Sequence, residues 1–222
     1  MLLNKEATPY LAELLGTFGF VFVAAGAIAA NSVSGDPIGI IGIALAQGVA
    51  LLAFIYTFNH ISGAHLNPAI TIALWITKRM EGPVAAGYVI AQLAGAVLAG
   101  IFVEGFFGNA RLAVPQLVSV DPTFAVLIEA VLTFVLVLVF FGIIVDRRSH
   151  TSHAGLAIGL VFTGLVLVGF SLTGAAINPA KAFGPALVGN LWTNHLVYWV
   201  GPILGGIAAA LTYEYGILRS KN

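Results

Sequence analysis

The sequence of 222 residues contains no cysteine, and only 8% of its residues are charged. The missing cysteines exclude disulfides and thiol chemistry. Basic and acidic residues are equal in number, so the formal net charge of zero gives no argument for nucleic-acid binding. The first ten residues lack a small-residue cleavage pattern after their apolar run, and we therefore expect the first hydrophobic segment to be retained.

Hydrophobic residues, in contrast, make up 59% of the chain, and the mean hydropathy is +1.02. This is far from the composition of a soluble domain and predicts an all-α integral membrane protein, a single transmembrane domain over residues 1–222. A membrane span needs about 20 apolar residues. Six segments meet this length, at residues 8–30, 38–59, 83–106, 123–145, 154–172 and 195–217.

Two shorter apolar stretches each follow the same triplet, Asn67-Pro68-Ala69 or Asn178-Pro179-Ala180. Asparagine is a favoured N-cap and proline suits the first helical position, so each triplet predicts the start of a helix. About ten residues give a helix of roughly 15 Å, half of a bilayer core of about 30 Å. Because lipid satisfies no backbone hydrogen bonds, such half-helices must be buried in protein or line a water-filled path.

The second half of the chain repeats the first. Tyr88 to Gly95 resembles Tyr198 to Gly205, and the two triplets lie in similar contexts 111 residues apart. Glu13 in the first span corresponds to Glu129 in the fourth. Three spans and one half-helix therefore occur twice, in halves of approximately 1–115 and 116–222, and an odd number of spans per half predicts an inverted repeat.

The basic residues predict the orientation, because lysine and arginine gather in cytoplasmic loops. With the N-terminus inside, only Arg111 falls in an outer loop, and Lys181 falls in the second half-helix. We therefore expect both termini to be cytoplasmic. The basic residues on that side are Lys5, Lys78, Arg79, Arg147, Arg148, Arg219 and Lys221.

Asn67 and Asn178 lie at the positive ends of the two half-helices. If each side-chain oxygen caps its own helix, we expect the NH2 group to be free to donate to a passing molecule. Two such donors would hold a water molecule by its oxygen and interrupt a proton-conducting chain, while the helix ends repel cations. One triplet alone could be a simple helix cap, but two copies in an inverted repeat favour a pore.

Glu13 and Glu129 lie within spans, where a carboxylate costs about 2.5 to 3.5 kcal/mol on insertion scales and is a functional candidate. One hypothesis makes them proton or ion relays. The favoured hypothesis makes them acceptors for the unpaired N–H groups of residues 63–66 and 174–177, which lead into the half-helices.

The sequence shows no signature of an enzyme, metal site or cofactor. The histidines do not follow a zinc-binding spacing, and a loop or cap role is the better interpretation of His60 and His65. His150 and His153, beside two arginines, are a candidate for a pH-sensitive loop. Neither a Gly-x-Ser-x-Gly motif nor a cluster of acidic residues is found.

The paired triplets, the contexts His60 to Ala69 and Asn178 to Ala186, and the duplicated Glu13 and Glu129 resemble the aquaporin and aquaglyceroporin family of major intrinsic proteins. The resemblance covers nearly the whole chain. It implies a right-handed bundle of six helices with two re-entrant half-helices, a pore in each protomer and a homotetramer in the plasma membrane. The short loops suggest a prokaryotic source.

In that family four positions near the outer mouth set the selectivity, and one is usually an arginine three residues after the second asparagine. The resemblance places these positions at Gln47, Val166, Ala175 and Lys181. Lysine keeps the charge but lacks the planar fork of arginine. We also consider that Lys181 extends to the outer water and leaves a wider constriction.

The expected main permeant is water, with small neutral solutes as additional permeants and with protons and ions excluded. The absence of an aromatic residue and a histidine from the filter positions suggests a wide mouth. Ala182, where glycerol facilitators have aspartate, and the pair Tyr198-Trp199 instead resemble water channels. A glycerol facilitator is the alternative, and an ion-coupled secondary transporter, which shares inverted repeats and broken helices, is a further one.

Overall fold

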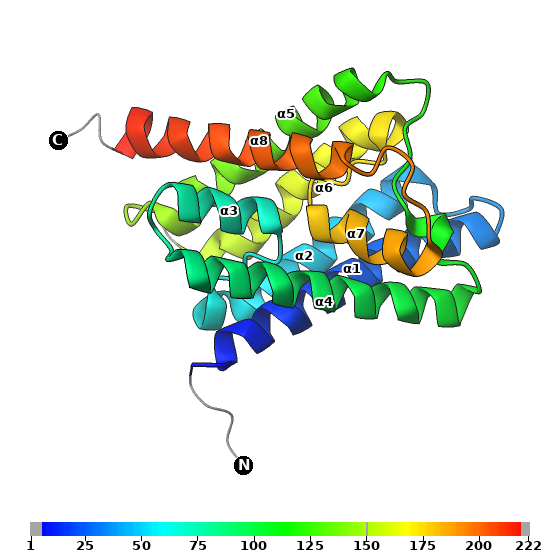
Figure 1. Cartoon of the computed structure of the whole chain (residues 1–222), viewed down its shortest axis with the longest axis horizontal. Helices are drawn as coiled ribbons and strands as arrows, with labels where there is room; N and C mark the ends of the chain where they lie inside the picture. The colour runs from blue at the N-terminus through cyan, green and yellow to red at the C-terminus, as the bar shows by residue number, and fades with distance from the viewer. Residues whose placement is uncertain (1–5, 150, 219–222) are drawn as a thin grey trace, which may run out of the picture.

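The computed structural model describes residues 6–149 and 151–218, and within these ranges it is helical and has no strand (Figure 1). Lys5, His150, Arg219 and Lys221 lie outside the described residues. The long α-helices are α1 (Thr8–Val33), α2 (Gly39–Ser62), α4 (Gly82–Phe107), α5 (Pro122–Phe140), α6 (Ala154–Thr173) and α8 (Val197–Leu211). The short ones are α3 (Pro68–Ile76) and α7 (Pro179–Gly189).

The long helices occupy the six predicted spans. Two of them change to π-helical geometry at their ends: α5 continues into η2 (Phe141–Val145) and α8 into η4 (Thr212–Leu218). Within the described ranges five helical stretches are long and apolar enough to cross a membrane. The sixth, α8, has 15 residues of α-helix and runs on without a break into the 7 residues of η4.

The two half-helices lie in the middle of the molecule between α4 and α8, with their first residues facing each other (Figure 1). They have 9 and 11 residues, close to the expected ten. Each packs against a span from the other half of the chain, α3 against α8 and α7 against α4. These exchanged contacts tie the two halves into one bundle.

Equivalent helices in the two halves pack in the same way, α1 against α4 and α5 against α8. Both crossings are close because a glycine lies at each. A Cβ atom on Gly95 would collide with the carbonyl oxygen of Leu14, and one on Gly205 would collide with that of Ala130. Small residues at such crossings let membrane helices approach and gain van der Waals contact.

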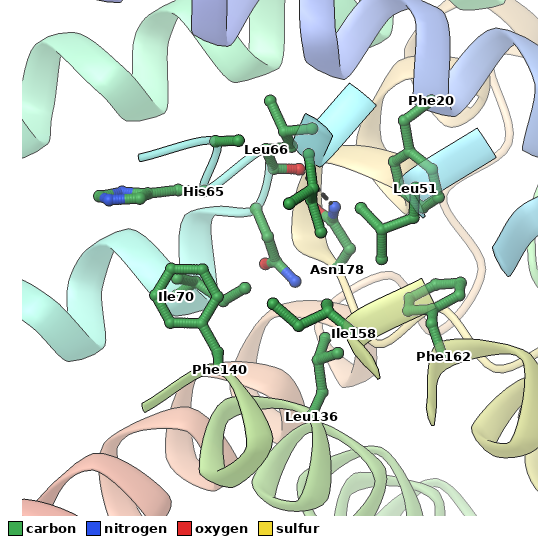
Figure 2. Close-up of a pocket in the computed structure, with 13 residues that line it drawn as sticks. Phe20, Leu51, His65, Leu66, Ile70, Leu136, Phe140, Ile158, Phe162 and Asn178 are labelled. Carbon is green, nitrogen blue, oxygen red and sulfur yellow. Dashed lines mark hydrogen bonds between the residues drawn. The ribbon is translucent and has the colours of Figure 1, made fainter. Parts of the chain in front are cut away.

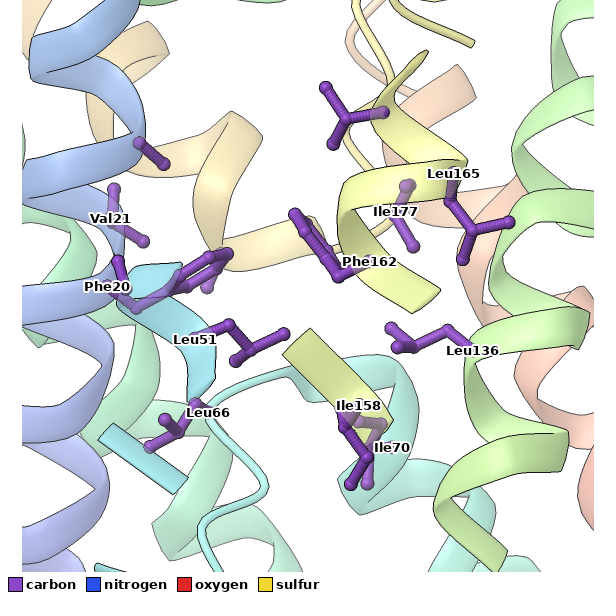
Figure 3. Packing of buried hydrophobic residues seen from close by; sticks show 14 of the residues in the cluster. Phe20, Val21, Leu51, Leu66, Ile70, Leu136, Ile158, Phe162, Leu165 and Ile177 are labelled. Atoms are coloured by element: carbon purple, nitrogen blue, oxygen red, sulfur yellow. The ribbon is translucent and has the colours of Figure 1, made fainter. Parts of the chain in front are cut away.

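A cluster of buried apolar side chains surrounds the point where the half-helices meet (Figure 3). It includes Phe20 from α1, Leu51 from α2, Leu136 from α5 and Phe162 from α6. The outer faces of the long helices carry many exposed leucine, isoleucine and valine side chains. In a membrane protein such faces meet lipid or another protomer, so the interior can hold the polar groups.

Candidate permeation site

Asn67 and Asn178 are the N-caps of the half-helices, as the sequence predicts. The Asn67 Oδ1 atom accepts from the backbone N–H of Ala69 at 2.9 Å. The Asn178 Oδ1 atom accepts from the N–H groups of Ala180 at 2.9 Å and Lys181 at 3.4 Å. Each side-chain oxygen is thus turned toward its own helix, and each NH2 group points the other way.

One N–H of each NH2 group is already engaged within the protein, which the sequence did not predict. Asn67 Nδ2 donates to the carbonyl oxygen of Ile177 at 3.1 Å, and Asn178 Nδ2 donates to that of Leu66 at 2.7 Å. Each amide therefore binds the chain just before the opposite half-helix. An NH2 group has two N–H donors, so one of them on each asparagine remains for another acceptor.

Both amides line a small cavity with a volume of about 10 Å³ (Figure 2). This is close to the smallest volume that holds one water molecule. His65 is the third polar residue of its lining. The remaining lining residues are Phe20, Leu51, Ile55, Ala64, Leu66, Ile70, Leu136, Phe140, Ile158 and Phe162. A molecule at this point meets amide donors on one side and apolar walls on the others.

Glu13 is fully buried and accepts four hydrogen bonds. Its Oε1 atom accepts from Ser62 Oγ at 2.7 Å and from the N–H of His65 at 2.9 Å. Its Oε2 atom accepts from the N–H of Leu66 at 2.8 Å and from Gln92 Nε2 at 2.7 Å. The carboxylate thus satisfies donors in the segment that leads into α3.

Glu129 has the equivalent place beside α7 and is also fully buried. Its Oε1 atom accepts from Thr173 Oγ1 at 2.6 Å and from the N–H of Ala176 at 2.9 Å. Its Oε2 atom accepts from the N–H of Ile177 at 2.7 Å. A buried carboxylate with several hydrogen-bond donors is well suited to hold irregular backbone in place.

The segments held by these carboxylates have a strained backbone. Left-handed φ angles alternate through both of them, at Ala64 (45°) and Leu66 (50°) before α3 and at Ala175 (45°) and Ile177 (59°) before α7. Such conformations cost about 1 to 3 kcal/mol each for residues other than glycine and persist only when the surroundings impose them. The hydrogen bonds to the carboxylates supply that constraint.

Three of the four filter positions are joined by hydrogen bonds. Lys181 Nζ donates to Gln47 Oε1 at 2.5 Å and to the carbonyl oxygen of Ala175 at 2.8 Å. The same ammonium lies 5.4 Å from the ring centroid of Phe162. Val166, the fourth position, is fully buried in the apolar cluster. Lys181 is only 3% exposed, so its side chain does not extend to the outer water, and that alternative was wrong.

The ammonium of Lys181 has no acidic partner within salt-bridge distance in residues 6–149 and 151–218. Its charge is stabilised by two carbonyl oxygens and an aromatic face instead. The Nε2 atom of Gln47 is buried without a hydrogen-bond partner. The pair therefore places the lysine Nζ atom and an unpaired amide donor side by side.

Two tyrosines have equivalent structural contacts that the sequence did not reveal. The hydroxyl of Tyr88 donates to the carbonyl oxygen of Ser62 at 3.1 Å. The hydroxyl of Tyr198 donates to the carbonyl oxygen of Thr173 at 3.0 Å. Trp199 donates from Nε1 to His195 Nε2 at 3.1 Å. Neither Tyr198 nor Trp199 lines the central cavity.

His65 and Phe162 were also missed as lining residues. His65 was expected to have a loop or cap role, whereas it is one of the residues that line the cavity, and its Nδ1 atom lies 3.1 Å from Thr71 Oγ1. Phe162 is one apolar residue in a long apolar span. The position of His65, two residues before Asn67, was a signal for the first. No signal identified Phe162, because apolar periodicity does not distinguish a pore wall from a core.

The model of the family described as "Major intrinsic protein" matches residues 4–213 of this chain. The chain is 42% identical to a probable aquaporin TIP3-2 of Arabidopsis thaliana, a match that covers 96% of this chain and 84% of the relative. It is 38% identical to aquaporin AqpM of Methanothermobacter thermautotrophicus, where the match covers 92% of this chain and 95% of the relative.

The fold is also similar to a solved structure. The aquaglyceroporin from Plasmodium falciparum superposes with a TM-score of 0.87 over 97% of this chain and 98% of that chain, at 24% identity. At this identity the likeness bears on the fold alone. It agrees with the helical bundle and the paired half-helices described above.

Proposed function

Because this chain belongs to the major intrinsic protein family, we propose that it is a passive membrane channel whose main permeant is water. The family places the protein in a membrane and among channels rather than enzymes. The choice of water as main permeant is supported by the cavity between Asn67 and Asn178, which has room for about one water molecule.

The asparagine pair suits water passage without proton passage. Each asparagine side chain is held by hydrogen bonds on both its oxygen and its nitrogen. The Oδ1 atom accepts from its own helix, and the Nδ2 atom donates to a carbonyl oxygen just before the other half-helix. One N–H of each Nδ2 remains for the cavity. A water molecule that accepts from these donors turns its own hydrogens away from them. The N-termini of α3 and α7 add partial positive charge at the same place, which opposes the entry of protons and other cations.

We assign Glu13 and Glu129 to the support of the half-helices rather than to ion coupling. All four oxygen atoms of the two carboxylates accept hydrogen bonds from protein groups. An ion relay would require these oxygens to exchange partners during transport. That exchange would release the strained segments, so a coupled transporter is the less favoured function.

Gln47, Val166, Ala175 and Lys181 form the proposed filter. The charge of Lys181 lies at the outer side of the second half-helix and repels cations, while the amide donor of Gln47 can bind a neutral polar solute. This filter lacks aromatic and histidine side chains, and for this reason small neutral solutes are proposed as additional permeants. A glycerol facilitator is the second candidate function, favoured by the same filter composition.

We further propose a homotetramer in the plasma membrane of a prokaryote, with both termini in the cytoplasm. The exposed apolar faces of the long helices support contacts with lipid and with other protomers. The basic loops support the orientation, since Lys78, Arg79, Arg147 and Arg148 fall on one side. The division into halves of approximately 1–115 and 116–222 likewise stays a proposal.

Stopped-flow light scattering of protein in liposomes tests the permeant, first with an impermeant osmolyte and then with a glycerol gradient. We expect fast shrinkage and slow glycerol entry. Lys181→Arg is the matched variant, because it keeps the charge and restores a planar fork. Glycerol entry as fast as water flux, and reduced in Lys181→Arg, would overturn water as the main permeant and establish the glycerol facilitator.

A further inference from the structure

A groove separate from the pore runs along the outside of the bundle between α3 and the first half of α4. It has a volume of about 510 Å³ and is lined by Ile72, Trp75, Gly82, Ala85, Ala86, Val89 and Ile90. Figure 1 shows α3 turning back into α4 at this point. From Gly82 to Ile90 the helix rises roughly 12 Å. The groove is therefore nearly as long as one leaflet of the bilayer core is deep, about 15 Å.

The groove ends in a polar depression of about 310 Å³, which shares Trp75 and Gly82 with it. Its other lining residues are Lys78, Arg79, Met80 and Glu81. The apolar groove thus opens directly into a depression with two basic side chains. These side chains lie in a loop that the distribution of basic residues assigns to the cytoplasmic side. This order, apolar within the bilayer and basic at its surface, matches the order of groups in a phospholipid.

The charges in the depression leave Lys78 as the available cation. The Arg79 guanidinium is held by Glu214, with Nε at 2.7 Å from Oε2 and Nη2 at 3.1 Å from Oε1. Lys78 is exposed and has no acidic partner within salt-bridge distance among the described residues. Glu81 carries the one opposing charge in the lining, and as the N-cap of α4 it forms no side-chain hydrogen bond to that helix.

Trp75 lies where the apolar and polar parts meet. Its side chain is 47% exposed, and its Nε1 atom lies 3.3 Å from the position that a Cβ atom on Gly82 would occupy. Tryptophan favours the depth at which hydrocarbon gives way to headgroups. The missing side chain at Gly82 leaves space for the indole and keeps the groove open toward Lys78.

We propose that this groove binds an anionic phospholipid, with an acyl chain between α3 and α4 and its phosphate beside Lys78. The apolar part selects a lipid over a soluble phosphate ester, and the unpaired ammonium selects an anionic headgroup over a zwitterionic one. The bidentate pair of Arg79 with Glu214 holds the loop in position for the headgroup. The bound lipid would fix the end of α3, a half-helix of the pore.

Fluorescence of Trp75 tests the proposal without any transport measurement. The chain has three tryptophans, so a Trp192→Phe and Trp199→Phe background leaves Trp75 as the only one. We expect brominated phosphatidylcholine to quench this protein in vesicles, and unbrominated phosphatidylglycerol to displace it with about fivefold preference, the effect typical of one basic residue near an anionic surface. Inorganic phosphate should not restore the fluorescence.

Three variants make the test specific to the groove. Lys78→Gln should reduce the preference for phosphatidylglycerol to about one, and Glu81→Gln should increase it, because the opposing charge is removed. Arg147→Gln removes a basic charge from another loop on the same side and should leave the preference unchanged. Ala86→Phe fills the apolar part and should abolish the preference while Lys78 is retained.

Several results would overturn the proposal. Equal affinity for the two lipids, or an equal loss of preference in Lys78→Gln and Arg147→Gln, would show a general surface-charge effect. No quenching by the brominated lipid would show that lipid does not occupy the groove, as when a second copy of the chain covers it. Recovery of fluorescence with inorganic phosphate alone would show a soluble anion site.

Discussion

Lys181 and Gln47, 134 positions apart in the sequence, are joined by a buried hydrogen bond from the lysine ammonium to the glutamine carbonyl oxygen at 2.5 Å. The bond crosses from α7 to α2 and links two of the four filter positions. It keeps a long, flexible side chain in one place, next to the carbonyl oxygen of Ala175. The position of the Lys181 ammonium thus depends on the uncharged side chain of Gln47.

The first prediction concerns this bond. Gln47→Leu removes one of two carbonyl acceptors, and a buried ammonium with fewer partners is expected to turn toward the outer water. The ratio of glycerol to water permeability should rise several-fold in stopped-flow measurements. Gln116→Leu makes the same chemical change at an exposed site and should leave the ratio unchanged. An unchanged ratio in Gln47→Leu would contradict a positioning role for Gln47.

The second prediction concerns the two buried carboxylates. Glu13→Gln replaces an acceptor oxygen by an NH2 group that faces N–H donors, and Glu129→Gln does the same beside α7. Each should lower the free energy of unfolding by about 3 kcal/mol, which corresponds to a fall in Tm of roughly 10 °C at this chain length. Thermal unfolding in detergent measures it.

Glu81→Gln, an exposed position, is the matched control for both variants and should leave Tm nearly unchanged. If Glu13→Gln and Glu129→Gln unfold like the original protein but lose transport that depends on an ion gradient, the support role is wrong and the carboxylates are relays.

The third prediction concerns helix crossings. Gly95→Ala places a methyl group against the carbonyl oxygen of Leu14, and such overpacking costs about 1 to 3 kcal/mol. Gly105, on the same helix, has no neighbouring atom within 4 Å of a built Cβ. Gly105→Ala should therefore be neutral or stabilise by about 0.5 to 1 kcal/mol. Equal thermal stability of the two variants would show that α1 and α4 are not closely packed in the membrane.

The fourth prediction concerns pH. Asp146 follows the π-helical end of α5, where hydrogen bonds from the Arg148 guanidinium hold the pKa of its carboxyl well below its ordinary value. A lowered pKa means that the ionised form is favoured by folding. The resulting stability is fully present above the unfolded pKa of about 3.9, and it is lost as the pH falls through the lower folded value.

Asp146→Asn should accordingly destabilise the protein by the same amount at every pH from 5 to 8, and by less below pH 4. Thermal unfolding of both proteins across this range measures the difference. If the stability difference between Asp146→Asn and the original protein disappeared between pH 5 and 8, the lowered pKa of Asp146 would be contradicted.

Local and repeated features of the fold were predictable from the sequence. The N-cap positions of Asn67 and Asn178 follow from the residue before proline at a helix start, and the spans follow from apolar segments of sufficient length. The repeat also associates one glutamate with each half-helix, in agreement with the contacts of Glu13 and Glu129. These features depend on short stretches of chain or on comparison of the chain with itself.

The remaining features depend on contacts between distant segments. The bonds from each asparagine to the carbonyl oxygen of Leu66 or Ile177 join residues more than a hundred positions apart. The position of Lys181 depends on where α2 presents Gln47. Phe162 could not be identified as part of the site, because an apolar side chain in an apolar span has the same pattern in a core and in a pore wall.

The central claim is that the channel passes water and excludes protons, and one preparation of liposomes tests both parts. Water flux is followed by stopped-flow scattering, and proton flux by a trapped pH-sensitive dye under a pH gradient with valinomycin present. The account predicts water flux far above that of empty liposomes and linear in the osmotic gradient, with proton flux equal to that of empty liposomes. Proton flux that rises with the amount of protein, or water flux no faster than in empty liposomes, would contradict it.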